Sequence, residues 1–128
     1  MPNYVLQSRR VAKPGSGQKV LDAVVEQFKT GSTQGNVSIS VNAPTGSGHL
    51  IVGARVLDSI DEIEKVNDRV IDSMNILDSI DIHCTDVQAQ VLRILAPAEN
   101  MPSKPKYMAR NILKAKSGKA QELAAALL

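Results

Sequence analysis

Residues 11–28 read "VAKPGSGQKVLDAVVEQF", and this stretch holds the features that indicate the fold class: a strand end, a turn and an amphipathic helix. Pro14 and Gly15 interrupt the strand, and Ser16 is of a residue type that caps helix N-termini. In the helix that follows, the apolar residues recur at i, i+1, i+4, i+5 and i+8 and form one stripe: Val20, Leu21, Val24, Val25 and Phe28. Residues 3–13 tolerate strand geometry, so the chain is predicted to open with a strand and a helix.

A predicted β-hairpin comes next. Residues 36–43, "NVSISVNA", alternate apolar and polar residues, which is the period of a half-buried strand. Residues 44–48, "PTGSG", form a turn, and residues 49–58, "HLIVGARVLD", supply a second strand.

A second helix and a fourth strand complete the pattern. Residues 59–74, "SIDEIEKVNDRVIDSM", begin with Ser59 and have Glu62 three residues later, which is a capping box. Residues 86–96, "DVQAQVLRILA", alternate again. The predicted order βαββαβ is the ferredoxin-like arrangement, an α+β domain over residues 1–96 with both helices on one face of a four-stranded antiparallel sheet.

The last third of the chain is predicted to be an appendage. Residues 97–106, "PAENMPSKPK", contain three prolines and indicate an extended linker. Residues 107–128 then match residues 4–25 at a constant offset, with Gly118 in the place of Gly15. We therefore expect an extra C-terminal strand–helix unit that partially repeats the opening of the chain.

Within this extra unit we predict a strand over residues 107–116 and a helix over residues 117–128. A lone unit of this kind cannot bury its own apolar face. It would dock on the sheet of its own chain, dock on the sheet of a partner, or belong to a second domain of a longer tandem protein.

Two stretches carry a resemblance to a known superfamily. They are "VAKPGSGQKVLDAVV" at residues 11–25 and "ARVLDSIDEIEKV" at residues 54–66, each a strand that runs through a turn or cap into an apolar helix. Because of these two stretches, residues 1–96 resemble the dimeric α/β-barrel superfamily, whose best-known branch is the antibiotic-biosynthesis-monooxygenase-like domain. The resemblance implies that two ferredoxin-like sheets pack face to face into a barrel, so the expected partner is a second copy of the chain, in a dimer or a higher oligomer.

Polar strand residues share one predicted face. If the apolar residues of strands 36–43 and 86–96 face the helices, the polar residues between them face away. With Arg55, and with either Arg9 or Arg10, they form the candidate ligand site: Arg9, Ser40, Asn42, Arg55, Gln88 and Gln90. Between two sheets this face would line a polar, slightly cationic cavity for a small anion. The alternatives are a solvated face or a polar contact between two sheets.

The histidines and the cysteine predict neither a metal site nor a nucleophile. We place His49 and His83 at opposite ends of the sheet, and no cluster near either supplies further zinc ligands. Neighbours on a strand point to opposite faces, so Cys84 beside His83 is interpreted as a small packing residue. We expect no cofactor.

Charge and composition limit the partners. Residues 1–96 hold nine basic and eleven acidic side chains, whereas residues 97–128 hold six and two, so the basic tail is expected to be drawn to the acidic region between Asp58 and Asp86. Nucleic acid is not an expected partner, because strand 49–58 has none of the aromatic residues on which bases stack. The start, "MPNYVLQSRR", has no signal-peptide pattern and no apolar run is long enough to span a membrane, so we expect a cytoplasmic protein without a membrane partner.

Three functional hypotheses remain open. The first is a non-catalytic small-ligand-binding α/β-barrel protein that works as an oligomer. The second is a cofactor-independent, monooxygenase-like enzyme acting on a small polar or aromatic compound in the same cavity. The third is a structural interaction module whose tail adds to another chain.

Overall fold

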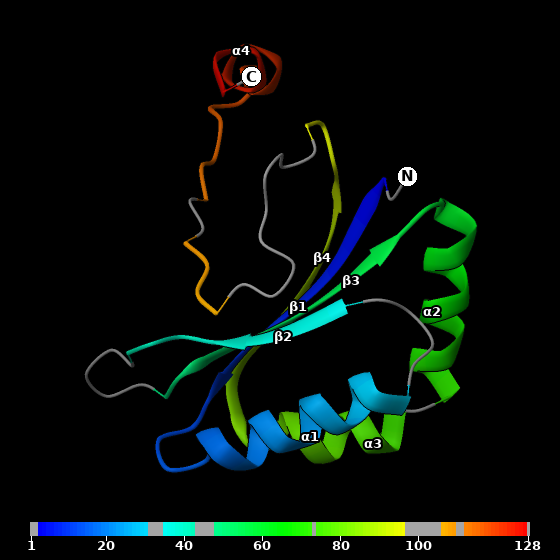
Figure 1. Cartoon of the computed structure of the whole chain (residues 1–128), viewed down its shortest axis with the longest axis vertical. Helices are drawn as coiled ribbons and strands as arrows, with labels where there is room; N and C mark the ends of the chain where they lie inside the picture. Colours follow the sequence, from blue (N-terminus) through cyan, green and yellow to red (C-terminus); the bar gives the residue numbers. More distant parts are fainter. Residues whose placement is uncertain are drawn as a thin grey trace. The chain divides into compact units, whose positions relative to one another are not determined.

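The computed structural model describes residues 3–30, 35–42, 48–72, 74–96, 106–109 and 112–127 (Figure 1). The chain divides into two compact units, one ending at Ile94 and one beginning at Leu95, and each is described by itself. The first unit contains all strands and helices except the last: β1 (Tyr4–Ala12), α1 (Gly17–Thr30), β2 (Gly35–Ile39), β3 (Leu50–Leu57), α2 (Ile60–Asp72), α3 (Met74–Asp81) and β4 (Cys84–Arg93). The second unit contains α4 (Ala120–Leu127).

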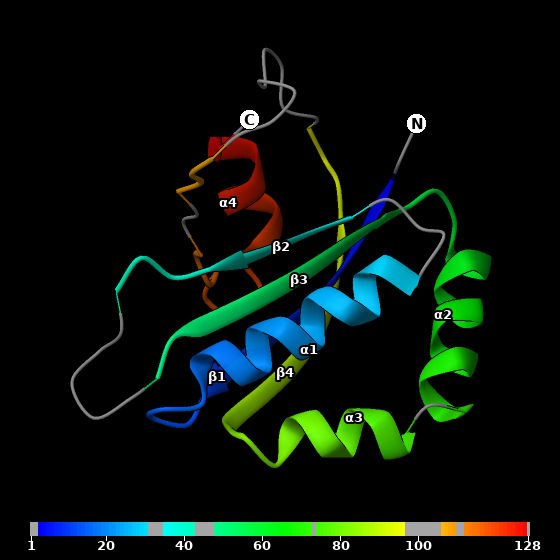
Figure 2. The same ribbon diagram turned by 60° about the horizontal axis from the view of Figure 1, so that its bottom comes forward.

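The first unit has the strand order of a ferredoxin-like fold. Its sheet runs β2-β3-β1-β4, and every neighbouring pair is antiparallel. Helices α1 and α3 lie side by side under one face of this sheet, with α2 beyond them (Figure 2). The predicted four-stranded antiparallel sheet with helices on one face is therefore confirmed.

The core lies between β1, β3 and the helices α1 and α3. Its buried cluster consists of Ala12, Val20, Val24, Ile51 and Ile80. The apolar stripe predicted for residues 17–28 supplies the α1 side of this cluster. Burial of that stripe stabilises a helix that would be marginal in water by itself.

The second helical stretch differs from its prediction. One helix was expected over residues 59–74, whereas the structure has α2 ending at Asp72 and a separate α3 that reaches Asp81. Helix α3 has only eight residues, of which only Ile80 is buried, so its apolar pattern in the sequence is short. One half of the predicted capping box is present at the start of α2, where Ser59 Oγ accepts from the Glu62 N–H at 3.4 Å. Glu62 Oε2 accepts from the N–H of Asp58 at 2.9 Å instead of from that of Ser59.

The pairing register decides which strand residues face the helices, because directly paired residues share a face. Val87 and Ala89 face the helices, as predicted, and Arg9 and Gln88 pair on the opposite face. Arg55 was expected on that opposite face, and this is wrong. It pairs with Leu6, and its guanidinium lies over the Phe28 ring of α1.

The second unit contains the predicted helix but not the predicted strand. Residues 107–109 and 112–116, the described part of the expected strand 107–116, form no strand in this single chain. A strand is stable only where another strand accepts and donates its ladder hydrogen bonds.

No helix among the described residues has the length and apolar content that a bilayer crossing requires.

We predict that Gly53→Ala destabilises the first unit by about 1–3 kcal/mol, as overpacking of a core does. An alanine Cβ at this position would lie 2.8 Å from two ring carbons of Phe28 and 3.1 Å from Ser8 Oγ. Gly17→Ala is the control, because its Cβ would meet only His49 Cδ2 at 3.8 Å and alanine favours the helix. Urea unfolding checks the pair, and equal midpoints for the two variants would contradict the proposed packing.

Candidate functional site

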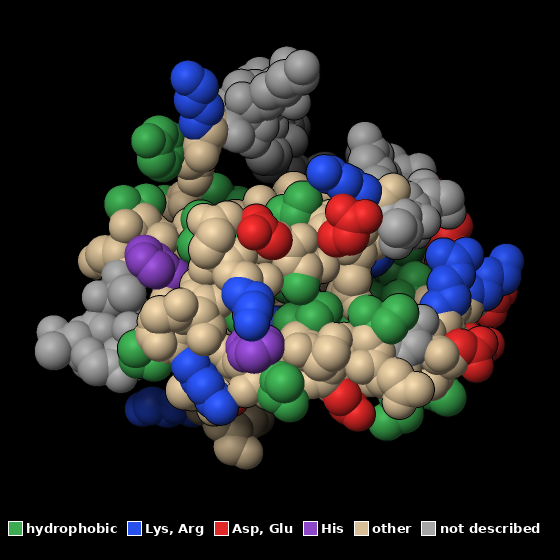
Figure 3. Space-filling view, turned by 90° about the horizontal axis from the view of Figure 1, so that it is seen from below, with side chains coloured by type: hydrophobic (Ala, Val, Ile, Leu, Met, Phe, Trp, Pro, Cys, Tyr) green, Lys and Arg blue, Asp and Glu red, His purple; other side chains and the backbone are tan. Residues whose placement is uncertain are grey.

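A cavity of about 460 Å³ lies between the sheet and the helices of the first unit. This volume falls within the range of small-molecule sites. Its walls are mostly apolar, and the apolar side chains come from β1, β4 and the three helices: Leu6, Phe28, Val66, Val70, Ile76, Leu77, Val87 and Ala89. On the helix side of the molecule, hydrophobic side chains are visible between the charged ones (Figure 3).

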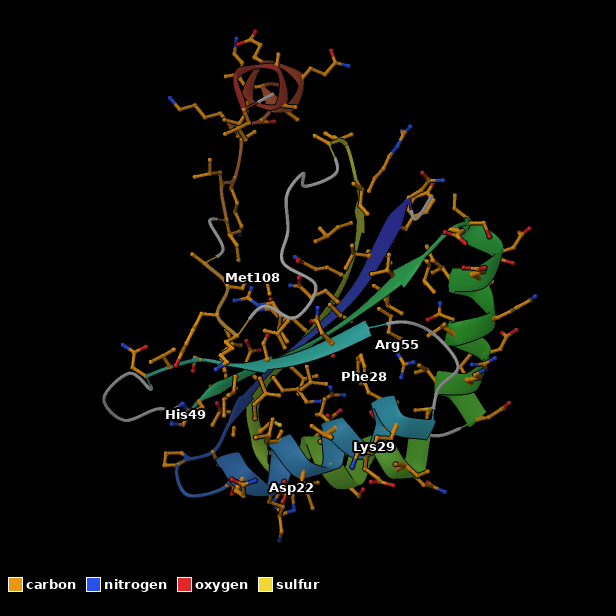
Figure 4. All side chains as sticks on the ribbon, in the orientation of Figure 1. Asp22, Phe28, Lys29, His49, Arg55 and Met108 are labelled. Carbon is orange, nitrogen blue, oxygen red and sulfur yellow. The ribbon has the colours of Figure 1, made fainter. Side chains whose placement is uncertain are left out.

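Two arginines add positive charge to this apolar cavity. Arg55 projects from β3 and stacks on Phe28, with its Cζ 4.3 Å from the ring centroid, and Figure 4 shows the two side chains together between the sheet and α1. Arg69 belongs to α2 and also lines the cavity. Burial lowers the pKa of Arg55, and the positive charge of Arg69 lowers it further. Among the described residues, no carboxylate forms an ion pair with either arginine.

A third arginine in the cavity wall has its own counter-ion. Arg10 Nε donates to Asp81 Oδ1 at 3.0 Å, and Arg10 Nη1 donates to Ser8 Oγ at 3.3 Å. The Arg10 side chain is only 8% exposed, whereas that of Asp81 is 35% exposed. This pair is electrically neutral, so the uncompensated charge of the cavity comes from Arg55 and Arg69.

The residues predicted to form a ligand site fall into three groups. Arg9, Gln88 and Gln90 lie together on the face opposite the helices, where Arg9 pairs directly with Gln88. Ser40 and Asn42 follow β2, which is the opposite edge strand from β4, so β3 and β1 separate them from the two glutamines. Arg55 lies on the other face, in the cavity.

Ser40 also has a structural role. Its Oγ accepts the backbone N–H of Leu50 at 3.0 Å, and its carbonyl oxygen lies 2.9 Å from His49 Nδ1. These contacts hold the end of β2 against the start of β3. The side chain of Ser40 is thus already engaged within the hairpin.

The predicted positions of the two histidines are wrong. The carbonyl of His49 accepts from the Ala12 N–H at 3.0 Å, and that of His83 accepts from the Lys13 N–H at 2.8 Å. Both residues therefore flank the end of β1, at the same end of the sheet. The reason is that β3 and β4 both run antiparallel to β1, so they begin at the same end. Within the described part of the chain, no group of three or more metal-ligating side chains forms.

Cys84 packs against the core cluster, as the sequence indicated. Its Sγ lies 3.7 Å from the carbonyl oxygen of Ile80. Burial raises the pKa of the Cys84 thiol, Asp81 raises it as well, and the nearby positive charges of Arg10 and Lys13 oppose this. A raised pKa keeps the thiol protonated at neutral pH, which is unsuitable for a nucleophile.

Sequence reasoning missed two features of the cavity. Arg69 lies between Val66 and Val70 on the apolar stripe of α2, and a basic residue within such a stripe was the available signal. For Arg55, the signal was its position in the alternation along the strand. Ile51, Gly53 and Leu57 lie an even number of residues from Arg55 and face the helices, so Arg55 faces the helices as well.

No protein-family model and no curated protein matches the chain. Among solved structures, it is similar to the de novo designed protein Foldit4, with a TM-score of 0.49 and 16% identity over 70% of this chain and 96% of that one. It is also similar to a Bacillus cereus protein assigned provisionally to the antibiotic biosynthesis monooxygenases, with a TM-score of 0.46 and 12% identity over 77% of this chain and 99% of that one. The ferredoxin-like assignment rests on the strand order and pairing described above.

We predict that Arg10→Ala lowers the free energy of unfolding by about 2 kcal/mol. This value lies between the cost of breaking a buried ion pair and the small contribution of an exposed one, because Asp81 is partly solvated. Arg9→Ala, on the opposite face of the same strand, is the matched control and should change stability by less than about 0.5 kcal/mol. Thermal or urea unfolding measures both, and similar effects of the two variants would contradict the assignment of faces.

Proposed function

We propose that this chain is a binding protein for a small amphipathic anion, which it holds in the cavity between the sheet and the helices. One observation carries the proposal: Arg55 and Arg69 share a mostly apolar cavity, and neither has a carboxylate partner among the described residues. A partly buried charge without a partner is costly, and its pairing with an anionic ligand would recover that cost.

The stacking of Arg55 on Phe28 supports recognition of an anion. Stacking uses the flat face of the guanidinium, whereas its five N–H donors lie in the plane of the group. These in-plane donors suit the two oxygens of a carboxylate or the oxygens of a phosphate. The Phe28 ring lies under the guanidinium carbon and offers no oxygen or nitrogen acceptor, so it supports the group without pairing its donors.

The apolar walls determine the rest of the ligand. Aliphatic side chains from α2, α3 and β4 line the space beside the two arginines, including Val66, Leu77 and Val87. They suit a hydrocarbon body attached to the anionic head. A fully polar anion such as inorganic phosphate would leave these walls without a partner.

We also propose that the protein works as an oligomer of the α/β-barrel type. The resemblance to that superfamily implies that the faces opposite the helices meet between two copies, and Arg9, Gln88 and Gln90 lie on this face. A ligand held between two sheets would contact Arg9, whereas a ligand in the helix-side cavity would contact Arg55. The two arginines thus distinguish the two locations.

Binding is favoured over a monooxygenase-like reaction. The enzymes of the resembled branch rely on Trp, Asn, Tyr or His in the cavity, and of these residue types the described lining contains only Asn67. Conversion of a bound compound in the presence of oxygen would support the enzymatic alternative.

We predict that octanoate binds to the protein more tightly than octanol, its neutral counterpart of the same chain length, because only the carboxylate pairs with the arginines. Arg55→Gln should weaken octanoate binding by about tenfold or more, the effect of losing a charge-assisted hydrogen bond, and leave octanol binding unchanged. Isothermal titration calorimetry measures both affinities.

Arg9→Gln is the matched control on the opposite face of the sheet and should leave octanoate binding unchanged. Equal affinities for octanoate and octanol in the wild type would contradict the proposal. A loss of binding in Arg9→Gln instead of Arg55→Gln would place the ligand between two sheets.

A further inference from the structure

Strand β4 is a long edge strand without the features that usually protect an edge. It has ten residues, lies at one end of the strand order and is exposed at every residue from Thr85 to Arg93. Proteins protect edges with lysines, prolines, bulges or very short strands. The other edge strand, β2, has only five residues, whereas residues 86–92 of β4 include neither lysine nor proline, and the irregularity in the pairing of β4 with β1 lies before Asp86. The edge of β4 is therefore suited to pairing with a further strand.

The backbone groups on this outer edge belong to alternate residues. The Ile94 N–H donates to the Asn3 carbonyl at 2.8 Å, so the backbone of Ile94 is directed toward β1. In an antiparallel ladder, the residues bonded to one neighbour alternate with those directed away from it. The register between β4 and β1 is unbroken from this end of the strand back to Asp86. The N–H and C=O groups directed to the outer edge are therefore those of Val87, Ala89, Val91 and Arg93.

The sequence of β4 is symmetric about Ala89. Residues 87–91 read "VQAQV", which is the same in both directions. When two copies of such a strand pair antiparallel around a two-fold axis, each residue meets the one at the mirrored position of the other copy. An axis at Ala89 therefore sets each Val87 opposite Val91 of the other copy. The glutamines at positions 88 and 90 meet in the same way.

This register matches the apolar surface that is exposed along β4. On the helix side, Val87 is 41% exposed and Val91 is 49% exposed. Direct cross-strand contact between β-branched side chains stabilises a strand pair, and this contact would occur twice, once on each side of the axis. An axis one residue away in either direction would instead set one of the valines opposite Thr85 or Arg93.

The two charged residues of β4 do not oppose this pairing. With the axis at Ala89, Asp86 lies opposite Leu92 of the other copy. Arg93 lies opposite Thr85 of the other copy. Like charges directly opposite each other destabilise a strand pair, and this register brings none together along β4.

We propose that β4 pairs with β4 of a second copy, antiparallel and with the two-fold axis at Ala89, so that two four-stranded sheets join into one. The outward N–H and C=O groups would bond to those of the other copy. Both helix layers would lie on the same face of the joined sheet, because directly paired residues share a face.

The occupant of the edge is a second copy because the sequence of this edge is complementary to itself, which is what an isologous contact requires. The contact uses the edge of the sheet and not the face opposite the helices. It is therefore separate from the barrel-type assembly, in which two such faces meet.

Amide hydrogen exchange of the full chain tests this pairing, because an alternating pattern is expected along β4. The Gln88 and Gln90 amides bond to β1 within one copy and should be protected at every protein concentration. The outward amides of Val87, Ala89 and Val91 should be protected only as copies associate, with exchange slowed by about tenfold or more. Light scattering on the same samples gives the mass.

Two double variants test the register through side chains on the face opposite the helices. Gln88→Glu with Gln90→Lys sets opposite charges across the axis twice, whereas Gln88→Glu with Gln90→Glu sets like charges there. The first should associate about tenfold more tightly than the second, because both cross-strand pairs change sign. The first keeps the net charge of +2 and the two glutamates of the second cancel it, so repulsion between whole molecules would favour the second instead.

The matched controls lie on the same face of the other edge strand, β2. Asn36→Glu with Ser38→Lys should associate as tightly as Asn36→Glu with Ser38→Glu. A difference between these two as large as that between the β4 variants would overturn the proposal, and so would equal association of the β4 variants.

The exchange pattern can also overturn the proposal. Outward amides protected equally at all concentrations would mean that the same chain covers the edge. A monomer at every concentration, or association without the alternating pattern, would exclude pairing between two β4 strands as well.

Discussion

The contact between Gly53 and the Phe28 ring fixes the relation between the sheet and the helix layer. Because Gly53 has no Cβ, the ring of Phe28 can lie directly on β3, at a distance that any larger residue would obstruct. The ring in turn supports the guanidinium of Arg55, two residues along the same strand. One small residue therefore positions both the end of α1 and the charged group of the cavity.

Much of the fold follows from periodicity, and the parts that do not follow depend on pairing between distant strands. The apolar stripe of α1 and the alternation of residues 36–39 are local patterns, so sequence reasoning predicts both elements. The direction of β3 relative to β1 is not a local property. Strand β2 runs parallel to β1, and the hairpin turns the chain back, so that β3 runs antiparallel to both. An incorrect direction for β3 placed His49 and His83 at opposite ends of the sheet.

In the candidate site, too, some residues were placed correctly from the local pattern of the sequence and others were not. Arg9, Gln88 and Gln90 were placed on the correct face, because alternation along a strand fixes which residues share a face. The error for Arg55 came from grouping residues by polarity instead of by strand phase. Polarity is a poor guide here, because an arginine can face a helix layer when an aromatic ring accommodates it. For Arg69 the sequence held one signal, a basic residue within the apolar stripe of α2, and the cavity beside that helix explains why an arginine stands there.

Helix α2 explains why this cavity exists and why a ligand would matter for stability. None of its residues is buried, although Val66 and Val70 form an apolar stripe directed toward the sheet side. The space between this stripe and the sheet is the cavity, so α2 lacks the apolar contacts that stabilise α1. A ligand that fills the space would bury both valines and neutralise Arg69 on the same helix. Binding and the stability of α2 are then thermodynamically linked, and a ligand at 100 times its dissociation constant stabilises the folded state by about 2.7 kcal/mol.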